Sequence, residues 1–122
     1  MNAGGEAGDA LKGLVNFDDF TRLDLRVGTV AKVEPNHDAC HPAYILTIDL
    51  GEVGNRKSSV QVTGRYASEE LLGRQVVCVV NFPAKRVAGA KSEVLVLAAV
   101  SASEGVVLLG PDDRVPNGAS VG

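Results

Sequence analysis

The 122-residue chain contains no tryptophan, and only 4% of its residues are aromatic. Its core must therefore consist mostly of valine, leucine, isoleucine and alanine side chains. Two cysteines are too few for a disulfide framework, and Cys78, which lies inside a run of valines, is interpreted as a buried core thiol. No stretch approaches the roughly 18 apolar residues of a membrane span, and residues 1–13 lack the charged start and apolar centre of a signal peptide. We therefore expect a cytoplasmic protein.

Catalytic motifs are missing as well. The sequence has no nucleophile elbow, no Walker phosphate loop and no glycine-rich dinucleotide motif. His37, Cys40 and His41 lie close together in a loop, but they lack the fourth ligand of a structural zinc site. We therefore predict a protein that is not an enzyme and that holds no metal or other cofactor.

Acidic residues outnumber basic ones and give a net charge of -3, which argues against a chain that binds nucleic acid over its whole surface. The charges are unevenly distributed, however. The segment from Arg56 to Lys91 holds seven cations and two acids, whereas the remainder holds five cations and 13 acids. This segregation predicts a basic face on an acidic body. The alternative is that cations from different strands scatter when the chain folds.

The most informative stretch runs from Asn81 to Leu97, N-F-P-A-K-R-V-A-G-A-K-S-E-V-L-V-L. It lies between two apolar runs and carries three cations, Lys85, Arg86 and Lys91. The pattern predicts a strand, a basic loop and a second strand. A basic loop framed by rigid strands could hold an anionic ligand. The alternative is a solvated loop whose cations serve only solubility.

A short helix is expected near the start of the ordered chain, after a disordered tail over residues 1–15. Asn16 can cap this helix. Phe17, Phe20 and Leu23 recur at a spacing that would place one face of the helix on the body of the protein.

Five segments have the apolar patterns of β-strands. In chain order these segments are 25–34, 43–50, 57–63, 75–82 and 93–100; a short helix capped by Ser68 follows the third, and a final strand arm covers 106–109. Gly28 in the first segment predicts a bulge or a sharp bend. Three strands, a helix and two strands is the order of the OB-fold. The predicted fold class is therefore all-β, a five-stranded Greek-key OB-fold barrel over residues 16–122, with short helices and a C-terminal extension.

The first strand opens with Asp24-Leu25-Arg26-Val27-Gly28, which resembles the tRNA-binding domain family, OB-folds related to the C-terminal domain of methionyl-tRNA synthetases. Four further segments, covering 43–51, 69–73, 81–83 and 116–118, fit the same family, so that the likeness spans roughly residues 17–122. Lys57-Ser58-Ser59 and the stretch 81–95 are most similar to stand-alone members, homodimers described as export-related chaperones. The synthetase-linked domains usually have Gly-Met where this chain has Glu93-Val94.

The resemblance implies a protein that binds tRNA or another structured RNA. Cations and polar donors bind RNA phosphates, and this contribution dominates affinity. The candidate RNA-binding residues are Arg26, Lys57, Arg65, Asn81, Lys85, Arg86, Lys91 and Ser92. Because aromatic residues are few, we expect recognition of RNA shape rather than extensive base stacking.

Two other functions are compatible with the sequence. The stand-alone members imply a molecular chaperone that binds exported preproteins or unfolded peptides and works with the export machinery. Phe82, Pro83 and Val87 are the candidate peptide-binding residues; the alternative is that Phe82 and Pro83 simply shape a strand end and pack in the core. The other alternative is a purely structural module that docks on another protein.

A homodimer is expected on physical grounds too. Residues 94–100 and 106–109 are apolar on both faces. A barrel strand with one solvated face would alternate, so this pattern predicts burial against a second copy.

Overall fold

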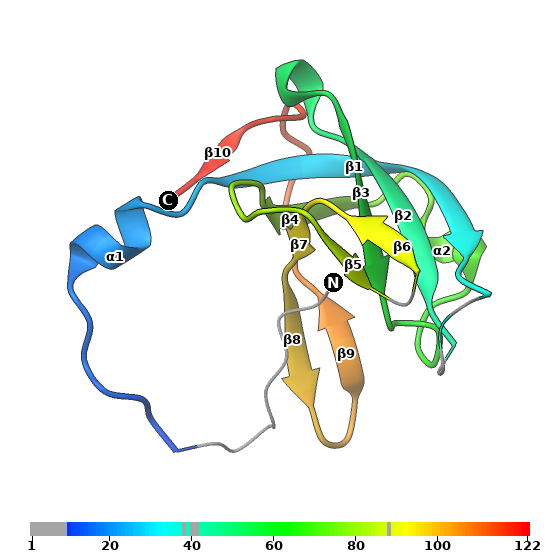
Figure 1. Ribbon diagram of the computed structural model, residues 1–122, viewed down its shortest axis with the longest axis horizontal. Coiled ribbons are helices and arrows are strands. Elements are labelled where there is room, and N and C mark those ends of the chain that lie inside the picture. Colours follow the sequence, from blue (N-terminus) through cyan, green and yellow to red (C-terminus); the bar gives the residue numbers. More distant parts are fainter. Residues whose placement is uncertain (1–9, 38, 40–41, 88) are drawn as a thin grey trace.

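The computed structural model describes residues 10–37, 39, 42–87 and 89–122 (Figure 1). The predictions for residues 1–9, Cys40 and His41 therefore lie outside the described residues. The elements in chain order are α1 (Phe17–Thr21), β1 (Leu25–Pro35), β2 (Tyr44–Asp49), the 3-10 helix η1 (Gly51–Val53), β3 (Asn55–Val60), α2 (Ser68–Leu71), β4 (Gln75–Val79), β5 (Lys85–Val87), β6 (Ala90–Ser92), β7 (Leu95–Val96), β8 (Ala98–Ser101), β9 (Gly105–Leu108) and β10 (Ser120–Val121). No helix in this described part of the chain is long and apolar enough to cross a membrane.

Five antiparallel strands form a nearly closed barrel in the order β3-β2-β1-β4-β7. The predicted OB-fold is therefore confirmed. The strand β1 is long enough to serve both halves of the barrel, since its first residues pair with β4 and its last residues pair with β2. A short C-terminal strand, β10, pairs with the start of β1, and this pairing was not predicted.

A glycine is needed at position 28 because β2 approaches its Cα atom closely, and not because a bulge forms there. A Cβ atom at this position would lie 2.5 Å from Ile48 Cγ2 and 2.9 Å from the carbonyl oxygen of Asp49. Gly28 itself is regularly paired with Val76 of β4, and the irregularity in the β1–β2 register falls later, between Val30 and Lys32. The predicted bulge therefore exists, but it lies beyond the glycine.

Aliphatic side chains fill the barrel, as the composition predicts. The fully buried members of this core include Leu46, Ile48, Leu50, Leu71, Val76 and Val94. Cys78 is also fully buried, which confirms its interpretation as a core thiol. Burial raises the pKa of the Cys78 thiol to about 12, because a thiolate would lose its hydration inside the barrel.

One predicted loop and one predicted strand differ from the observed elements. The segment 81–92 is not an unstructured basic loop, because β5 and β6 pair within it as an antiparallel hairpin. The predicted strand over 93–100 is divided. Its first part, β7, completes the barrel beside β4, and its second part, β8, leaves the barrel and pairs with β9 in a separate two-stranded sheet (Figure 1).

The short helices also deviate from prediction. The N–H of Asn16 donates to the Asp19 carboxylate at 3.2 Å, so α1 begins where expected. Its phenylalanines do not pack on the body, since Phe17 is 76% exposed and Phe20 42% exposed. In α2 the capping position is taken by Ala67, one residue before the predicted Ser68.

Candidate nucleic-acid interface

The basic residues of the central stretch lie on the β5–β6 hairpin. Lys85 faces Ser92 across the hairpin and Arg86 faces Lys91. The turn contains Gly89 at φ 81°, in the left-handed region that glycine adopts without steric cost. A hairpin forms here because the short strands β5 and β6 flank a turn glycine. Strand β6 also packs beside β3 of the barrel.

Buried serines connect this hairpin to strand β3. Ser92 is fully buried, its hydroxyl accepts the N–H of Ser59 at 3.2 Å, and it lies 3.5 Å from the hydroxyl of Ser58. The next residue continues the connection. The N–H of Glu93 donates to the Lys57 carbonyl at 2.7 Å, and the N–H of Lys57 donates to the Glu93 carboxylate at 3.2 Å. The hairpin is thus fixed to the barrel by backbone and side-chain hydrogen bonds together.

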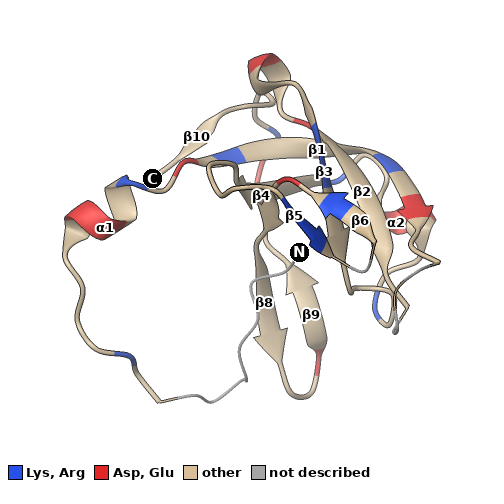
Figure 2. Cartoon of the chain, in the orientation of Figure 1, with Lys and Arg blue, Asp and Glu red and all other residues tan. Residues whose placement is uncertain are grey.

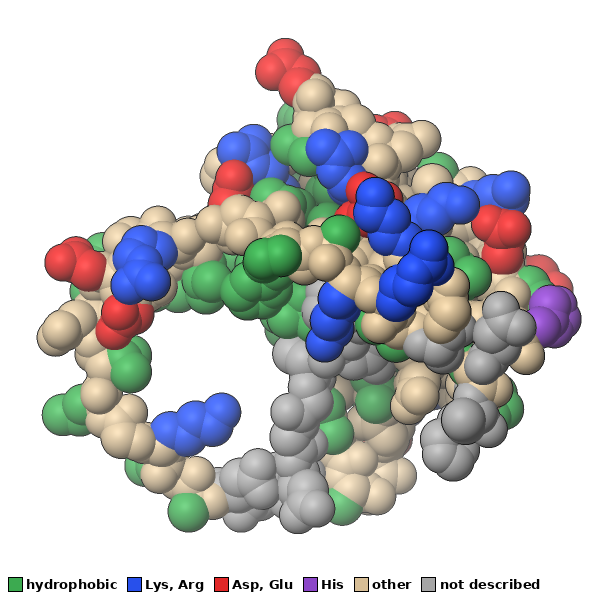
Figure 3. Space-filling view, in the orientation of Figure 1, with side chains coloured by type: hydrophobic (Ala, Val, Ile, Leu, Met, Phe, Trp, Pro, Cys, Tyr) green, Lys and Arg blue, Asp and Glu red, His purple; other side chains and the backbone are tan. Residues whose placement is uncertain are grey.

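The result is a surface that carries the side chains of Lys57, Lys85, Arg86 and Lys91, which we call the basic surface. All four residues are exposed. Figure 2 shows lysine and arginine positions on β5, β6 and the neighbouring part of β3, and Figure 3 shows basic side chains gathered over the same part of the molecule. Within the described residues none of the four forms an ion pair with an acid. An open hollow of about 350 Å³ is lined by Ala84 and the three cations of the hairpin.

Asn81 lies between β4 and the β5–β6 hairpin and makes two hydrogen bonds to the residues just before β1. Its side-chain oxygen accepts the N–H of Asp24 at 2.9 Å, and its amide nitrogen donates to the Arg22 carbonyl at 2.8 Å. Both ends of the amide are therefore occupied by the protein. Asn81 joins the end of β4 to the segment between α1 and β1.

The two other predicted cations lie elsewhere and are paired with acids. The guanidinium of Arg26 donates to the Asp24 carboxylate at 2.9 Å and to the Gly118 carbonyl at 3.2 Å. Hydrogen bonding to Asp24, followed by its charge, raises the pKa of Arg26. Arg26 therefore joins the start of β1 to the C-terminal segment, away from the hairpin.

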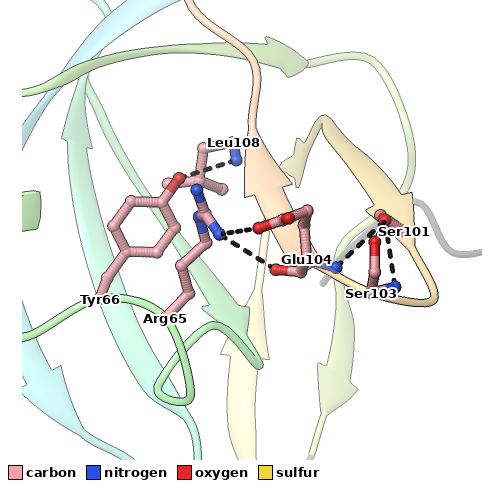
Figure 4. Close-up of polar contacts among 6 residues, drawn as sticks. All are labelled: Arg65, Tyr66, Ser101, Ser103, Glu104 and Leu108. Carbon is pink, nitrogen blue, oxygen red and sulfur yellow. Dashed lines mark hydrogen bonds and ion pairs between the residues drawn. The ribbon is translucent and has the colours of Figure 1, made fainter.

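Arg65 lies beside the β8–β9 sheet. Its guanidinium donates to both the carbonyl and the carboxylate of Glu104, at 3.1 and 3.3 Å (Figure 4). The neighbouring Tyr66 hydroxyl accepts the N–H of Leu108 at 3.2 Å. In the turn between β8 and β9, the Ser101 hydroxyl accepts the backbone N–H groups of Ser103 and Glu104. The contacts of Arg65 and Tyr66 anchor the protruding β8–β9 sheet to the barrel, whereas those of Ser101 stabilise the turn of this sheet itself.

The candidate peptide-binding residues lie just before and within β5. Phe82 is 39% exposed, Pro83 is exposed, and Val87 is half-buried. The alternative in which Phe82 and Pro83 pack in the core is therefore wrong. An exposed aromatic ring next to a basic hairpin in the sequence could contact either a nucleotide base or an apolar peptide side chain.

Glu93 has a role in the site that was not predicted from the sequence. The signal was present, because Glu93 is the only acid between Glu70 and Glu104 and it follows the last cation of the hairpin. An isolated acid in a basic segment suggests a specific partner. That partner is a backbone N–H of another strand, which no sequence pattern identifies.

The family model described as "Putative tRNA binding domain" matches residues 25–120. The crystal structure of the chaperone CsaA from Bacillus anthracis superposes with a TM-score of 0.86 at 53% identity, over 90% of this chain and 100% of that chain. The CsaA chaperone protein from Picrophilus torridus gives 0.84 at 39% identity, over 89% of this chain and 100% of that one.

A methionine–tRNA ligase from Pyrococcus abyssi is 41% identical over 107 residues, which are 88% of this chain. The chain spans only 14% of the length of that ligase. The similarity therefore concerns one domain of the ligase and not the enzyme as a whole.

Proposed function

The chain belongs to the tRNA-binding domain family, and we propose that it binds tRNA through the basic surface formed by β5, β6 and β3. In this proposal the protein is a binding module rather than an enzyme, and it acts in the cytoplasm, where tRNA is found. The CsaA chaperones are structurally similar to this chain along their whole length, which supports a binding module built from this domain.

One observation carries the proposal. Lys57, Lys85, Arg86 and Lys91 are exposed and, among the described residues, have no acidic partner, although the chain as a whole is acidic. Elsewhere Arg26 and Arg65 are paired with nearby acids. A set of unpaired cations on one rigid surface provides the positive potential that a polyanion needs.

The proposed contact is mainly with phosphates. Of the aromatic residues, Tyr66 is buried and Phe82 is exposed near the hairpin in sequence. A surface with four cations and few aromatics can follow the backbone of a folded RNA, whereas it offers few platforms for stacked bases. We therefore expect binding to structured tRNA with little preference among tRNA species. Ser92 and Asn81 contribute by positioning the hairpin, since their polar atoms bond to the protein.

A salt titration with bulk tRNA tests the proposal. Binding measured by gel shift should weaken as salt rises, because bound counterions are released from the RNA. Replacing Lys85 and Arg86 together by alanine should reduce affinity at least about tenfold at low salt and lower the salt slope by about 1.5, as two phosphate contacts are lost.

The matched control removes Arg22 and Lys32, two exposed cations that are paired with their own acids. This double variant changes the net charge by the same amount and should bind tRNA nearly as well as the parent. Absence of binding by the parent at low salt, or equal losses in the two double variants, would contradict the proposal.

A second candidate function is that of a chaperone for exported or unfolded polypeptides. Its support is the exposure of Phe82 and Pro83 beside the basic hairpin, together with the chaperone structures that are similar to this chain. The purified protein should then suppress aggregation of a denatured client, and Phe82→Ser should abolish the suppression while leaving tRNA affinity nearly unchanged. No suppression at stoichiometric excess rules out this function, and a protein that binds neither ligand is better described as a docking module.

We further propose a homodimer. The arm before the barrel carries exposed apolar residues, namely Leu11, Leu14, Val15, Phe17 and Phe20. Figure 1 shows that α1 and residues 10–16 stand away from the barrel and from the β8–β9 sheet. Exposed apolar side chains on a projecting arm are costly in water unless a partner covers them. A second copy of the chain, with its own arm and its own β8–β9 sheet, is the partner proposed.

A further inference from the structure

Two cations of the hairpin are placed directly opposite each other. Arg86 of β5 and Lys91 of β6 are Cα partners in the β5–β6 register. Side chains of such pairs leave the sheet on the same face, with Cβ atoms about 5 Å apart. Like charges in this arrangement destabilise a hairpin, whereas opposite charges stabilise it. The free protein therefore keeps an unfavourable pair at the centre of its basic surface.

The geometry prevents the pair from relaxing fully. The guanidinium of Arg86 donates through Nη1 to the Gly89 carbonyl at 2.9 Å, which holds it across the turn that leads into β6. Lys91 precedes the fully buried Ser92, so its backbone is fixed by the contacts of Ser92 with β3. The two cations are thus kept on one face of a short and anchored hairpin.

No acid of the described residues forms an ion pair with either cation. Glu93, the nearest acid in sequence, uses a carboxylate oxygen on the N–H of Lys57. Lys85 and Ala84 complete the open hollow of about 350 Å³ beside the pair. Three cations therefore line the hollow, and none of the described residues that line it is an acid.

From this arrangement we propose that Arg86 and Lys91 form a two-point clamp for a single phosphate group, and that the bound phosphate stabilises the hairpin. The clamp deepens the proposed function, since a phosphodiester of tRNA is its physiological ligand. Inorganic phosphate carries the same chemistry and should occupy the same site weakly. Binding and hairpin stability are then coupled, because the anion removes the repulsion between its two ligands.

The first test uses the protein alone. Phosphate should raise the Tm of the parent above that in sodium chloride of equal ionic strength. The variant Lys91→Glu replaces the repulsion by an ion pair with Arg86, so at low salt its Tm should exceed that of the parent by about 2 °C. The same variant should lose the specific response to phosphate. Lys91→Gln, which only removes the repulsion, should be intermediate in Tm and should also lose the response.

The second test adds bulk tRNA. Lys91→Glu should weaken tRNA binding at least about tenfold although the protein is more stable. Lys12→Glu, an equal charge reversal on the exposed arm, serves as the control and should bind nearly normally. A variant that is more stable and yet binds less supports a clamp, because a purely structural role for Lys91 would make stability and binding fall together.

The outcomes separate the clamp from the proposed function. Phosphate-specific stabilisation that Lys91→Glu abolishes supports the clamp, even where the parent fails to bind tRNA and the proposed function falls. If the parent binds tRNA but Lys91→Glu is no more stable and responds to phosphate like the parent, the clamp is overturned while the proposed function stands. The clamp is also overturned if the parent has the same Tm in phosphate as in sodium chloride of equal ionic strength.

Discussion

Lys57 and Glu93 are linked by two hydrogen bonds that involve the backbone of both residues. The Lys57 carbonyl accepts the N–H of Glu93 at 2.7 Å, and the Lys57 N–H donates to the Glu93 carboxylate at 3.2 Å. The pair lies where β3 meets the segment between β6 and β7, which is the place where the barrel closes. The contact therefore joins the cation of β3 to the cations of the hairpin and makes one surface of them.

Substitution of Glu93 separates its structural contact from its charge. Glu93→Ala removes the acceptor for the Lys57 N–H, so we expect a loss of about 1 kcal/mol in the free energy of unfolding and roughly fivefold weaker tRNA binding. Glu93→Gln keeps an acceptor oxygen and removes a negative charge beside the cations. We expect it to retain most of the stability and to bind tRNA more tightly than the parent. Urea unfolding and gel shifts measure both effects.

Opposite effects of these two variants on affinity are the informative result. If Glu93 acted only by repelling RNA, both substitutions would tighten binding. If both weaken binding equally, the carboxylate has a role that an amide cannot replace, and the positioning argument fails.

Asn81 is expected to matter for stability and little for RNA contact. Asn81→Ala removes two hydrogen bonds, to the Asp24 N–H and the Arg22 carbonyl, and should cost about 2 kcal/mol. Asn81→Asp keeps only the acceptor and should lie between Ala and the parent. Chemical denaturation measures the loss, and tRNA affinity well below Tm should change less than about threefold. A large loss of affinity in a fully folded Asn81→Ala protein would instead indicate direct contact with RNA.

The buried thiol predicts a stability that depends on pH. The pKa of Cys78 rises from an ordinary 9.0 to about 12 in the folded protein, so between these values the unfolded chain loses a proton that the folded chain keeps. The folded state is therefore most favoured below pH 9 and loses this contribution as pH rises toward 12. Per pH unit the loss is about 1.4 kcal/mol.

Cys78→Ala provides the reference for this effect. Other groups titrate over the same range, but they contribute to both proteins alike. The difference in unfolding free energy between parent and variant, measured by denaturant titration at pH 8, 10 and 11, should shrink as pH rises. A difference that stays constant would show that the thiol ionises normally in the folded protein.

The apolar arm predicts the behaviour of the proposed dimer. Replacing Phe17 and Phe20, which are 76% and 42% exposed with ring centroids 6.2 Å apart, by serine should shift the protein to monomers in sedimentation velocity. Both residues are exposed in a single chain, so unfolding of the monomer should change by less than about 1 kcal/mol. Leu72→Ser, at another exposed apolar position, is the control and should leave the dimer intact. A parent that sediments as a monomer contradicts the proposal.

Most of the barrel followed from the sequence by itself. Apolar patterns located the five barrel strands, and the run around Cys78 identified a buried strand, because burial of alternate or continuous apolar residues is a local property of a strand. The concentration of cations between residues 56 and 91 likewise predicted a basic face. The limits of the elements were less accurate, since β4 ends at Val79 and the strand expected over 93–100 divides into two sheets.

Only the tertiary structure decided which cations act together. Arg26 and Arg65 look like the hairpin cations in sequence, yet Asp24 and Glu104 are their partners, and Glu104 is 39 residues from Arg65. Ser92 looked like a surface donor, but the barrel closes over it. The contact of Arg26 with Asp24 is local, whereas that of Arg65 with Glu104 joins distant segments whose separation along the chain carries no periodic signal. The opposition of Arg86 and Lys91 also depends on the fold: both cations are visible in the sequence, and only the hairpin register makes them face each other.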